Sequence, residues 1–112
     1  MSPSQSAFSK KGTADGKVCT ISVQIAKSDP QKLFDRKICI TFYRGGFPFQ
    51  EEIKSVSGEK PSETAKRAFD SLIKKVKKAF LNEDGINFKD GINFDELESF
   101  ISSFKGEVLS AL

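Results

Sequence analysis

The chain contains no histidine and no tryptophan, and only two of its 112 residues are cysteines. Without histidine, the Ser-His and Cys-His pairs that activate a nucleophile are excluded, and the side chain that titrates near neutral pH is missing. Two cysteines are too few for a structural zinc site or for a fold held by disulfides. Because the sequence offers no phosphate-binding loop or cluster of metal ligands either, we expect no enzymatic activity, no cofactor and no metal.

The chain also lacks any apolar run near the ~20 residues that cross a bilayer. Its beginning, MSPSQSAFSKKGTADGK, has no apolar segment of the kind that a secretory signal needs, so we expect a soluble, cytoplasmic protein. A length of 112 residues suits one domain with one core. Residues 1–16 bury too little apolar surface to offset the entropy of ordering, which predicts a mobile N-terminal tail followed by a single domain over 17–112.

Three segments alternate apolar and polar residues in the manner of β-strands. They cover residues 17–27, 37–43 and 47–56. The pair Gly45-Gly46 supplies the positive φ angles of a two-residue hairpin turn, which predicts that the second and third segments pair with Phe42 opposite Phe49. Pro48 cannot donate a ladder hydrogen bond, which predicts that the third segment lies at an edge of the sheet or begins near this proline.

The same register separates the two cysteines. Cys19 shares a strand face with the apolar residues of its segment and points into the core, whereas Cys39 points away from the face that carries Ile40 and Phe42. We therefore expect no disulfide between them.

The second half of the chain changes to the period of amphipathic helices. From Pro61 onward, apolar residues recur on one helical face: Phe69, Leu72, Ile73, Val76 and Phe80. A second set follows Asn93, whose spacing to Glu96 resembles a capping box: Phe94, Leu97, Phe100, Ile101, Phe104 and Val108. This order predicts an α+β fold, with a three-stranded antiparallel sheet (β-β-β-α-α order) covered on one face by two amphipathic helices.

Between these helices the pentapeptide DGINF occurs twice, in DGINFKDGINF over 84–94. The segment resembles half of a calcium-binding EF-hand loop with Glu96 at the last ligand position, but Lys89 then occupies another ligand position, which disfavours a cation. Asp-Gly pairs favour turns, so we interpret the segment as a connection that anchors its phenylalanines in the core. A small hairpin around Asp90-Gly91 is an alternative that the turn chemistry also allows.

Charge is distributed unevenly over the predicted helices. Residues 60–80 carry seven basic and two acidic side chains, a balance of +5, whereas residues 81–112 carry two basic and seven acidic ones, a balance of −5. The simplest interpretation is that two antiparallel helices neutralise each other. The alternative is a basic stripe opposite the apolar face of the first helix, aimed at phosphates or an acidic partner. The stripe consists of Arg67, Lys74 and Lys78, flanked by Lys75 and Lys77.

These patterns favour a small non-enzymatic binding or adaptor domain that engages a protein partner through the edge strand over 47–56 and the basic helix face. The main alternative is nucleic-acid binding through the stripe, with stacking contacts near the sheet edge from Tyr43, Arg44, Phe47 and Phe49. We expect no membrane association, because the apolar helix face that would insert is needed to cover the sheet. The partner-binding candidates are Tyr43, Arg44, Arg67, Lys74, Lys75, Lys77 and Lys78.

Overall fold

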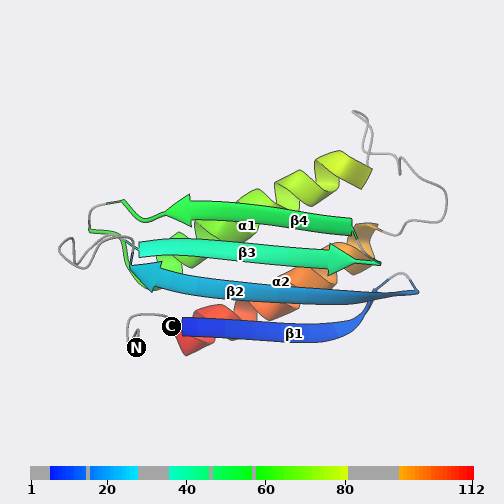
Figure 1. The fold of residues 1–112 in the computed structure, drawn as a ribbon, viewed down its shortest axis with the longest axis horizontal. Helices are drawn as coiled ribbons and strands as arrows, with labels where there is room; N and C mark the ends of the chain where they lie inside the picture. The colour runs from blue at the N-terminus through cyan, green and yellow to red at the C-terminus, as the bar shows by residue number, and fades with distance from the viewer. Residues whose placement is uncertain (1–5, 15, 28–35, 46, 57, 81–93) are drawn as a thin grey trace.

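The computed structural model describes residues 6–14, 16–27, 36–45, 47–56, 58–80 and 94–112 of the chain. These residues form four strands followed by two helices (Figure 1). The elements are β1 (Ser6–Ala14), β2 (Lys17–Lys27), β3 (Arg36–Arg44), β4 (Phe47–Lys54), α1 (Pro61–Phe80) and α2 (Phe94–Ala111). The predicted α+β class, with an antiparallel sheet and two helices, is confirmed.

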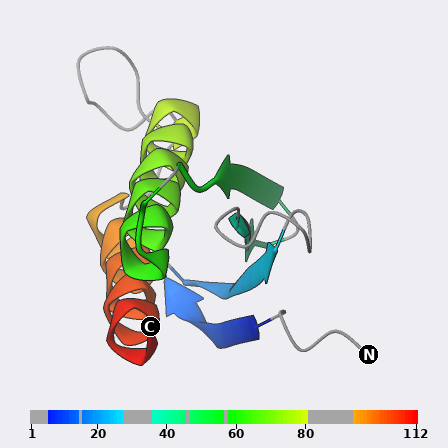
Figure 2. The same cartoon turned by 90° about the vertical axis from the view of Figure 1, so that its left-hand side faces the viewer.

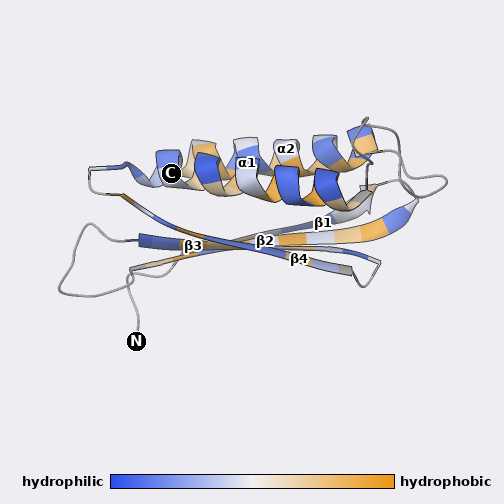
Figure 3. Cartoon of the chain, turned by 90° about the horizontal axis from the view of Figure 1, so that it is seen from above, coloured by the Kyte–Doolittle hydropathy of each residue, from blue (hydrophilic) through white to orange (hydrophobic). Residues whose placement is uncertain are grey.

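The strands form one sheet in the order β1-β2-β3-β4, and each neighbouring pair is antiparallel. Both helices lie on the same side of this sheet (Figures 2 and 3) and run in opposite directions along it (Figure 1). Helix α1 packs over β3 and β4, and helix α2 packs against β1. Apolar residues alternate with polar ones in the strands because one face of the sheet meets the helices and the other does not.

The structure corrects the predicted number of strands. The sequence predicts three strands and a mobile N-terminal tail, but Ser6–Ala14 pairs with β2 along its length and makes the sheet four-stranded. Phe8 is the one large apolar residue in this strand, whose other inward positions include Lys10 and Gly12. Backbone pairing and the tight turn at Gly16, which has a φ of 75°, therefore hold the strand more than apolar side chains do.

The predicted register between β3 and β4 is confirmed. Phe42 lies opposite Phe49, and Ile38 lies opposite Ile53. Gly45 in the turn has a φ of 59°, which a residue with a side chain rarely adopts. Strand β4 also lies at an edge of the sheet, as predicted from its proline.

The two cysteines lie on opposite faces of the sheet, as predicted. Cys19 is buried against the helices, whereas Cys39 is half-buried on the opposite face, where Gln50 Nε2 donates to its sulfur at 3.2 Å. Neither cysteine is in a disulfide.

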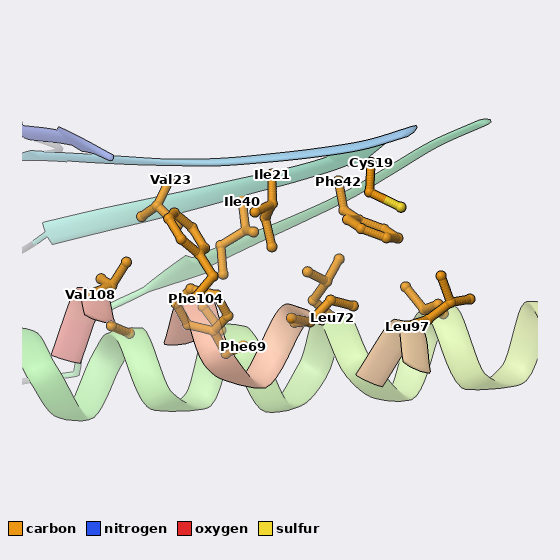
Figure 4. Close-up of a cluster of buried hydrophobic side chains, with 14 of the residues drawn as sticks. Cys19, Ile21, Val23, Ile40, Phe42, Phe69, Leu72, Leu97, Phe104 and Val108 are labelled. Atoms are coloured by element: carbon orange, nitrogen blue, oxygen red, sulfur yellow. The ribbon is translucent and has the colours of Figure 1, made fainter. Parts of the chain in front are cut away.

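The core lies between the sheet and the helices (Figure 4). Its fully buried members include Ile21, Val23, Ile38, Ile40, Phe42, Phe69, Leu72, Val76, Leu97 and Ile101. Phe69 of α1 meets Phe104 of α2 edge to face, with ring centroids 5.9 Å apart. Burying an aliphatic or Phe side chain contributes about 1.5–3 kcal/mol relative to leaving it exposed, so this layer is the main source of stability.

The helix ends follow from local chemistry. Helix α1 begins at Pro61, whose fixed φ suits a first helical position, and Glu63 Oε1 accepts the Lys60 N–H at 2.9 Å. Helix α2 begins at Phe94, which is buried in the core as predicted. Apart from Phe94 and Glu96, the residues of the DGINF repeat and of its calcium-loop comparison, and the capping residue Asn93, lie outside the described residues. Neither described helix has the length and apolar character to cross a bilayer.

Candidate functional site

The backbone groups along the edges of the sheet form the first candidate surface. Successive residues of a strand point their N–H and C=O groups to opposite sides, so pairing on one side fixes what faces the other. Gly45 N–H donates to the Val18 carbonyl at 3.2 Å, so even-numbered residues of β2 bond to β3 and odd-numbered ones to β1. Gly12 lies opposite Cys19, so even-numbered residues of β1 bond to β2. The outward-facing residues of β1 are therefore Ala7, Ser9, Lys11 and Thr13.

The outward edge of β1 is open. Within the described part of the chain, no hydrogen bond reaches the outward backbone groups of this strand. The strand is nine residues long and contains no proline. Such a row of unpaired donors and acceptors is a ready template for an added strand.

Strand β4 forms the other edge. Ser55 N–H donates to the Arg36 carbonyl at 2.7 Å, so odd-numbered residues of β4 bond to β3 and even-numbered ones face outward. The outward-facing residues of β4 are Pro48, Gln50, Glu52 and Lys54.

Side chains of helix α1 occupy two outward carbonyls of this second edge. Lys75 Nζ donates to the outward carbonyl of Gln50 at 2.7 Å. Arg67 Nη2 donates to the outward carbonyl of Lys54 at 3.0 Å. Pro48 has no N–H to offer an added strand. The strand that we predicted as the partner site thus lies at an edge, but helix side chains already occupy part of its backbone.

A carboxylate between β4 and α1 holds Arg67 in this position. Glu59 accepts from Arg67 Nε at 2.7 Å and from Nη2 at 2.8 Å, so the second Nη2 hydrogen is directed at Lys54. Thr64 Oγ1, at 2.8 Å, and the Val56 N–H, at 3.1 Å, also bond to Glu59. The hydrogen bonds from Arg67, then those from Thr64 and Val56, lower the pKa of Glu59 to about 2. The same pairing raises the pKa of Arg67.

A second carboxylate holds Lys75. Glu51 lies on the inward face of β4 and accepts from the Ser71 hydroxyl and from Lys75 Nζ, the latter at 3.1 Å. Donation by Ser71, followed by that of Lys75, lowers the pKa of Glu51. Lys75 thus bonds a side chain and a backbone carbonyl of the same strand, and α1 is fastened to β4 both here and at Arg67.

Helix α2 lies beside β1 without reaching the outward backbone groups of that strand. Lys10, on the inward face of β1, donates to Glu107 Oε2 of α2 at 2.6 Å. Phe100 of α2 packs over Gly12, where an added Cβ would lie 2.8 Å from the ring. Phe8 and Phe100 are only partly buried, so apolar surface remains exposed along this side of the core.

The structure places Tyr43 and Arg44 on opposite faces of β3, so these predicted site residues do not form one platform. Tyr43 is 46% exposed on the face that the helices leave open, whereas Arg44 is only 8% exposed on the core side. Consecutive strand residues point to opposite faces, which accounts for the separation. On this face Tyr43 lies opposite Thr20 of β2 and Pro48 of β4, and Thr41 is the next residue of β3 on the same face.

The basic candidates on α1 divide into two groups. Arg67 and Lys75 are engaged at the β4 edge. Lys74, Lys77 and Lys78 are exposed and make no ion pair or hydrogen bond to the part of the chain that the structure describes. The stripe predicted from the sequence is therefore not a uniform set of available cations.

The charge pairing between the two helices differs from the predicted pairing. Among the described residues, Lys105 of α2 bonds Asp70 of α1 at 2.9 Å, which reverses the predicted polarity. Glu107 of α2 is paired with Lys10 of β1. Neither of these acidic side chains masks the three exposed lysines at the end of α1.

The outward residues of β1 are the candidates that the sequence interpretation missed. The available signal was the pair Asp15-Gly16, which separates Ala14 from Lys17 as Gly45-Gly46 separates β3 from β4. An Asp-Gly pair between two strand segments is a hairpin signal.

Comparisons of the chain with protein-family models, with curated proteins and with solved structures find no match.

Proposed function

We propose that the protein is a small non-enzymatic binding domain that accepts an extended segment of a partner protein along the outward edge of β1. The contrast between this open edge and the occupied edge of β4 carries the proposal. Main-chain hydrogen bonds to an added strand supply affinity, and contacts with alternate side chains supply specificity. The site on β1 replaces the edge over 47–56 as the partner surface.

The side chains beside the edge define the chemistry of the partner. Alternate residues of an added strand face inward, toward Phe8, Gly12 and the ring of Phe100. Apolar and β-branched side chains fit these neighbours. The intervening residues lie beside Ser9 and Lys11 on the opposite face, where polar or acidic side chains pair favourably. We expect a segment of alternating apolar and polar residues with an acid near Lys11.

A displayed library of random peptides, selected against the purified full chain, tests the proposal. Recovered peptides with the alternating pattern are synthesised, and their affinity is measured by fluorescence anisotropy for the wild type and for Ser9→Pro. Proline at this position removes an outward N–H without breaking the pairing of β1 with β2, because edge strands tolerate proline there. We expect binding to weaken about tenfold, since the loss of a hydrogen bond is combined with steric obstruction by the ring.

Gln50→Pro is the matched control, because it removes an outward N–H from β4 and, like Ser9→Pro, leaves the charge unchanged. Circular dichroism establishes that both variants fold. Wild-type affinity in Gln50→Pro, together with weakened binding in Ser9→Pro, supports the β1 site. Full binding by Ser9→Pro, equal losses in both variants, or failure to recover an alternating peptide would each contradict it.

A further inference from the structure

The last two turns of α1 carry three exposed lysines without an anionic partner among the described residues: Lys74, Lys77 and Lys78. Residues three and four positions apart are neighbours on a helix, so these like charges repel each other in the isolated protein. The helix dipole attracts cations at the C-terminus and accounts for Lys77 and Lys78, which lie in the last turn. It accounts less well for Lys74, one turn earlier.

The acidic side chains on the exposed face of α1 are engaged elsewhere. Asp70 bonds Lys105 at 2.9 Å. Glu63 Oε1 accepts the backbone N–H of Lys60 at 2.9 Å, at the other end of the helix. The positive field of the lysines is therefore not cancelled on their own helix face.

We propose that Lys74, Lys77 and Lys78, the α1 lysine cluster, bind the phosphates of a nucleic acid. From Lys74 to Lys78 the helix rises about 6 Å. Each strand of a duplex carries a phosphate about every 3.4 Å along the axis, so neighbouring phosphates of one molecule can meet several of these ammonium groups together. A formal net charge of +3 favours the approach of such a polyanion.

An anionic membrane is the competing surface. A basic helix binds a membrane when it also inserts an apolar face, but Phe69, Leu72 and Val76 of α1 are 0% exposed against the core. Among the side chains whose burial the structure describes, the large apolar ones that are exposed lie outside α1: Val18, Tyr43, Val56 and Leu112. Among these described side chains the cluster thus presents charge without apolar anchors, which favours a nucleic acid.

This site is independent of the proposed protein-binding edge. Helix α1 packs over β3 and β4, whereas β1 is the strand at the opposite end of the sheet order. Substitution of the lysines therefore leaves the β1 edge intact, and either site can fail without the other.

The test is a titration of labelled oligothymidine and of a labelled DNA duplex with the full chain at several salt concentrations, followed by fluorescence anisotropy. The variant Lys74→Gln/Lys77→Gln/Lys78→Gln is compared with the wild type. We expect its affinity at low salt to fall at least about tenfold. The slope of log K against log salt should fall by about 2–3 for the duplex and by about 2 for the single strand.

The matched control is Lys11→Gln/Lys17→Gln/Lys54→Gln, which removes the same charge from exposed lysines elsewhere. A large loss of affinity in the cluster variant and a small one in the control supports the site. Equal losses would mean that only overall charge matters, and no wild-type binding at low salt would exclude the site. Binding to phosphatidylserine vesicles without binding to either oligonucleotide would also overturn the proposal, in favour of a membrane.

Discussion

Strands β1 and β4 are the two edges of one antiparallel sheet, and the helices treat them differently. On β4, Lys75 and Arg67 reach from α1 to two outward carbonyls, and each is held by a carboxylate. On β1, Lys10 and Glu107 bond on the inward side and leave the outward backbone groups uncovered among the described residues. Long basic side chains on a covering helix can thus occupy the backbone of a strand edge that lies within their reach.

Strand β1 also carries residues that protect its edge against indiscriminate strand pairing. Charged side chains on an edge discourage indiscriminate pairing, and this strand carries Lys10 and Lys11. The two lysines do not occupy the backbone donors and acceptors of β1. In the proposed function, their charges restrict which segments can pair with this strand. In the proposed function such an edge selects among partner segments, whereas part of the β4 edge is already occupied by α1.

The largest expected effect comes from opening the β4 edge with Arg67→Ala/Lys75→Ala. The double variant removes hydrogen bonds between charged groups and leaves the nearly buried Glu59 without its main partner. We expect the free energy of unfolding to fall by about 2–4 kcal/mol, because bonds to charged groups contribute about 1.5–3 kcal/mol each and these are partly exposed. Urea denaturation measures the loss, and sedimentation velocity detects association through the newly exposed edge.

Lys74→Ala/Lys78→Ala is the control for that experiment. It removes the same number of charges from the same helix, at positions without a partner among the described residues. Its stability should stay within about 0.5 kcal/mol of the wild type. Equal destabilisation by both double variants would show that the bonds to β4 do not distinguish the two edges.

A somewhat smaller effect is expected at the seam between β1 and α2. Gly12→Val places atoms where a Cβ already lies 2.8 Å from the Phe100 ring, so we expect a loss of about 1–3 kcal/mol from overpacking. Gly106→Ala in α2 meets nothing within 4 Å and should stabilise the protein by about 0.5–1 kcal/mol, because alanine favours a helix. Thermal unfolding followed by circular dichroism measures both, and a tolerated Gly12→Val would mean that α2 does not press on β1.

The smallest expected effect is a loss of folding stability at acidic pH. The pKa of Glu59 is about 2 in the folded protein and 4.5 for the ordinary group, so its pairing stabilises the fold fully above pH 4.5. This contribution is lost as the pH falls from 4.5 toward 2. The lowered pKa of Glu51 acts in the same direction. Half-exposed Arg67 is screened by water, which keeps the effect modest.

Urea midpoints between pH 7 and pH 2 test this dependence. In Glu59→Gln the part of the decline due to Glu59 should disappear, while the part due to Glu51 remains. A decline of unchanged size in Glu59→Gln would assign the acid sensitivity to other carboxylates.

The sequence suffices to predict β2, β3 and β4, because side-chain alternation and the Gly45-Gly46 turn both report on a sheet with one buried face. It does not suffice for β1, where Lys10 and Gly12 take inward positions that apolar residues occupy in the other strands. Lys10 is accommodated there because Glu107 meets its charge, and that carboxylate comes from the far end of the chain. The alternation of apolar and polar residues alone therefore fails to identify a strand whose inward polar residue forms an ion pair with a helix.

The sequence also does not distinguish the cations of α1 that are bound to β4 from those that are exposed. Arg67 and Lys74 belong to the same predicted stripe, yet Arg67 meets Glu59 and β4 whereas Lys74 meets neither. Helical spacing fixes the side of the helix on which a residue lies, but the residue's partner depends on which strand passes beneath it. The burial of Arg44 next to exposed Tyr43 has the same origin in tertiary packing.

The two bonds from α1 to the β4 backbone also bear on how many molecules can assemble through their sheet edges. Sheets extend into fibres when each molecule both receives a neighbour on one edge and offers a second edge to the next. With the carbonyls of Gln50 and Lys54 taken by α1, β1 is the edge whose outward backbone groups are all open among the described residues. If a partner strand adds to β1 as proposed, the assembly ends at a single partner, or at a closed pair with a second copy, and the protein is then a terminus and not a link.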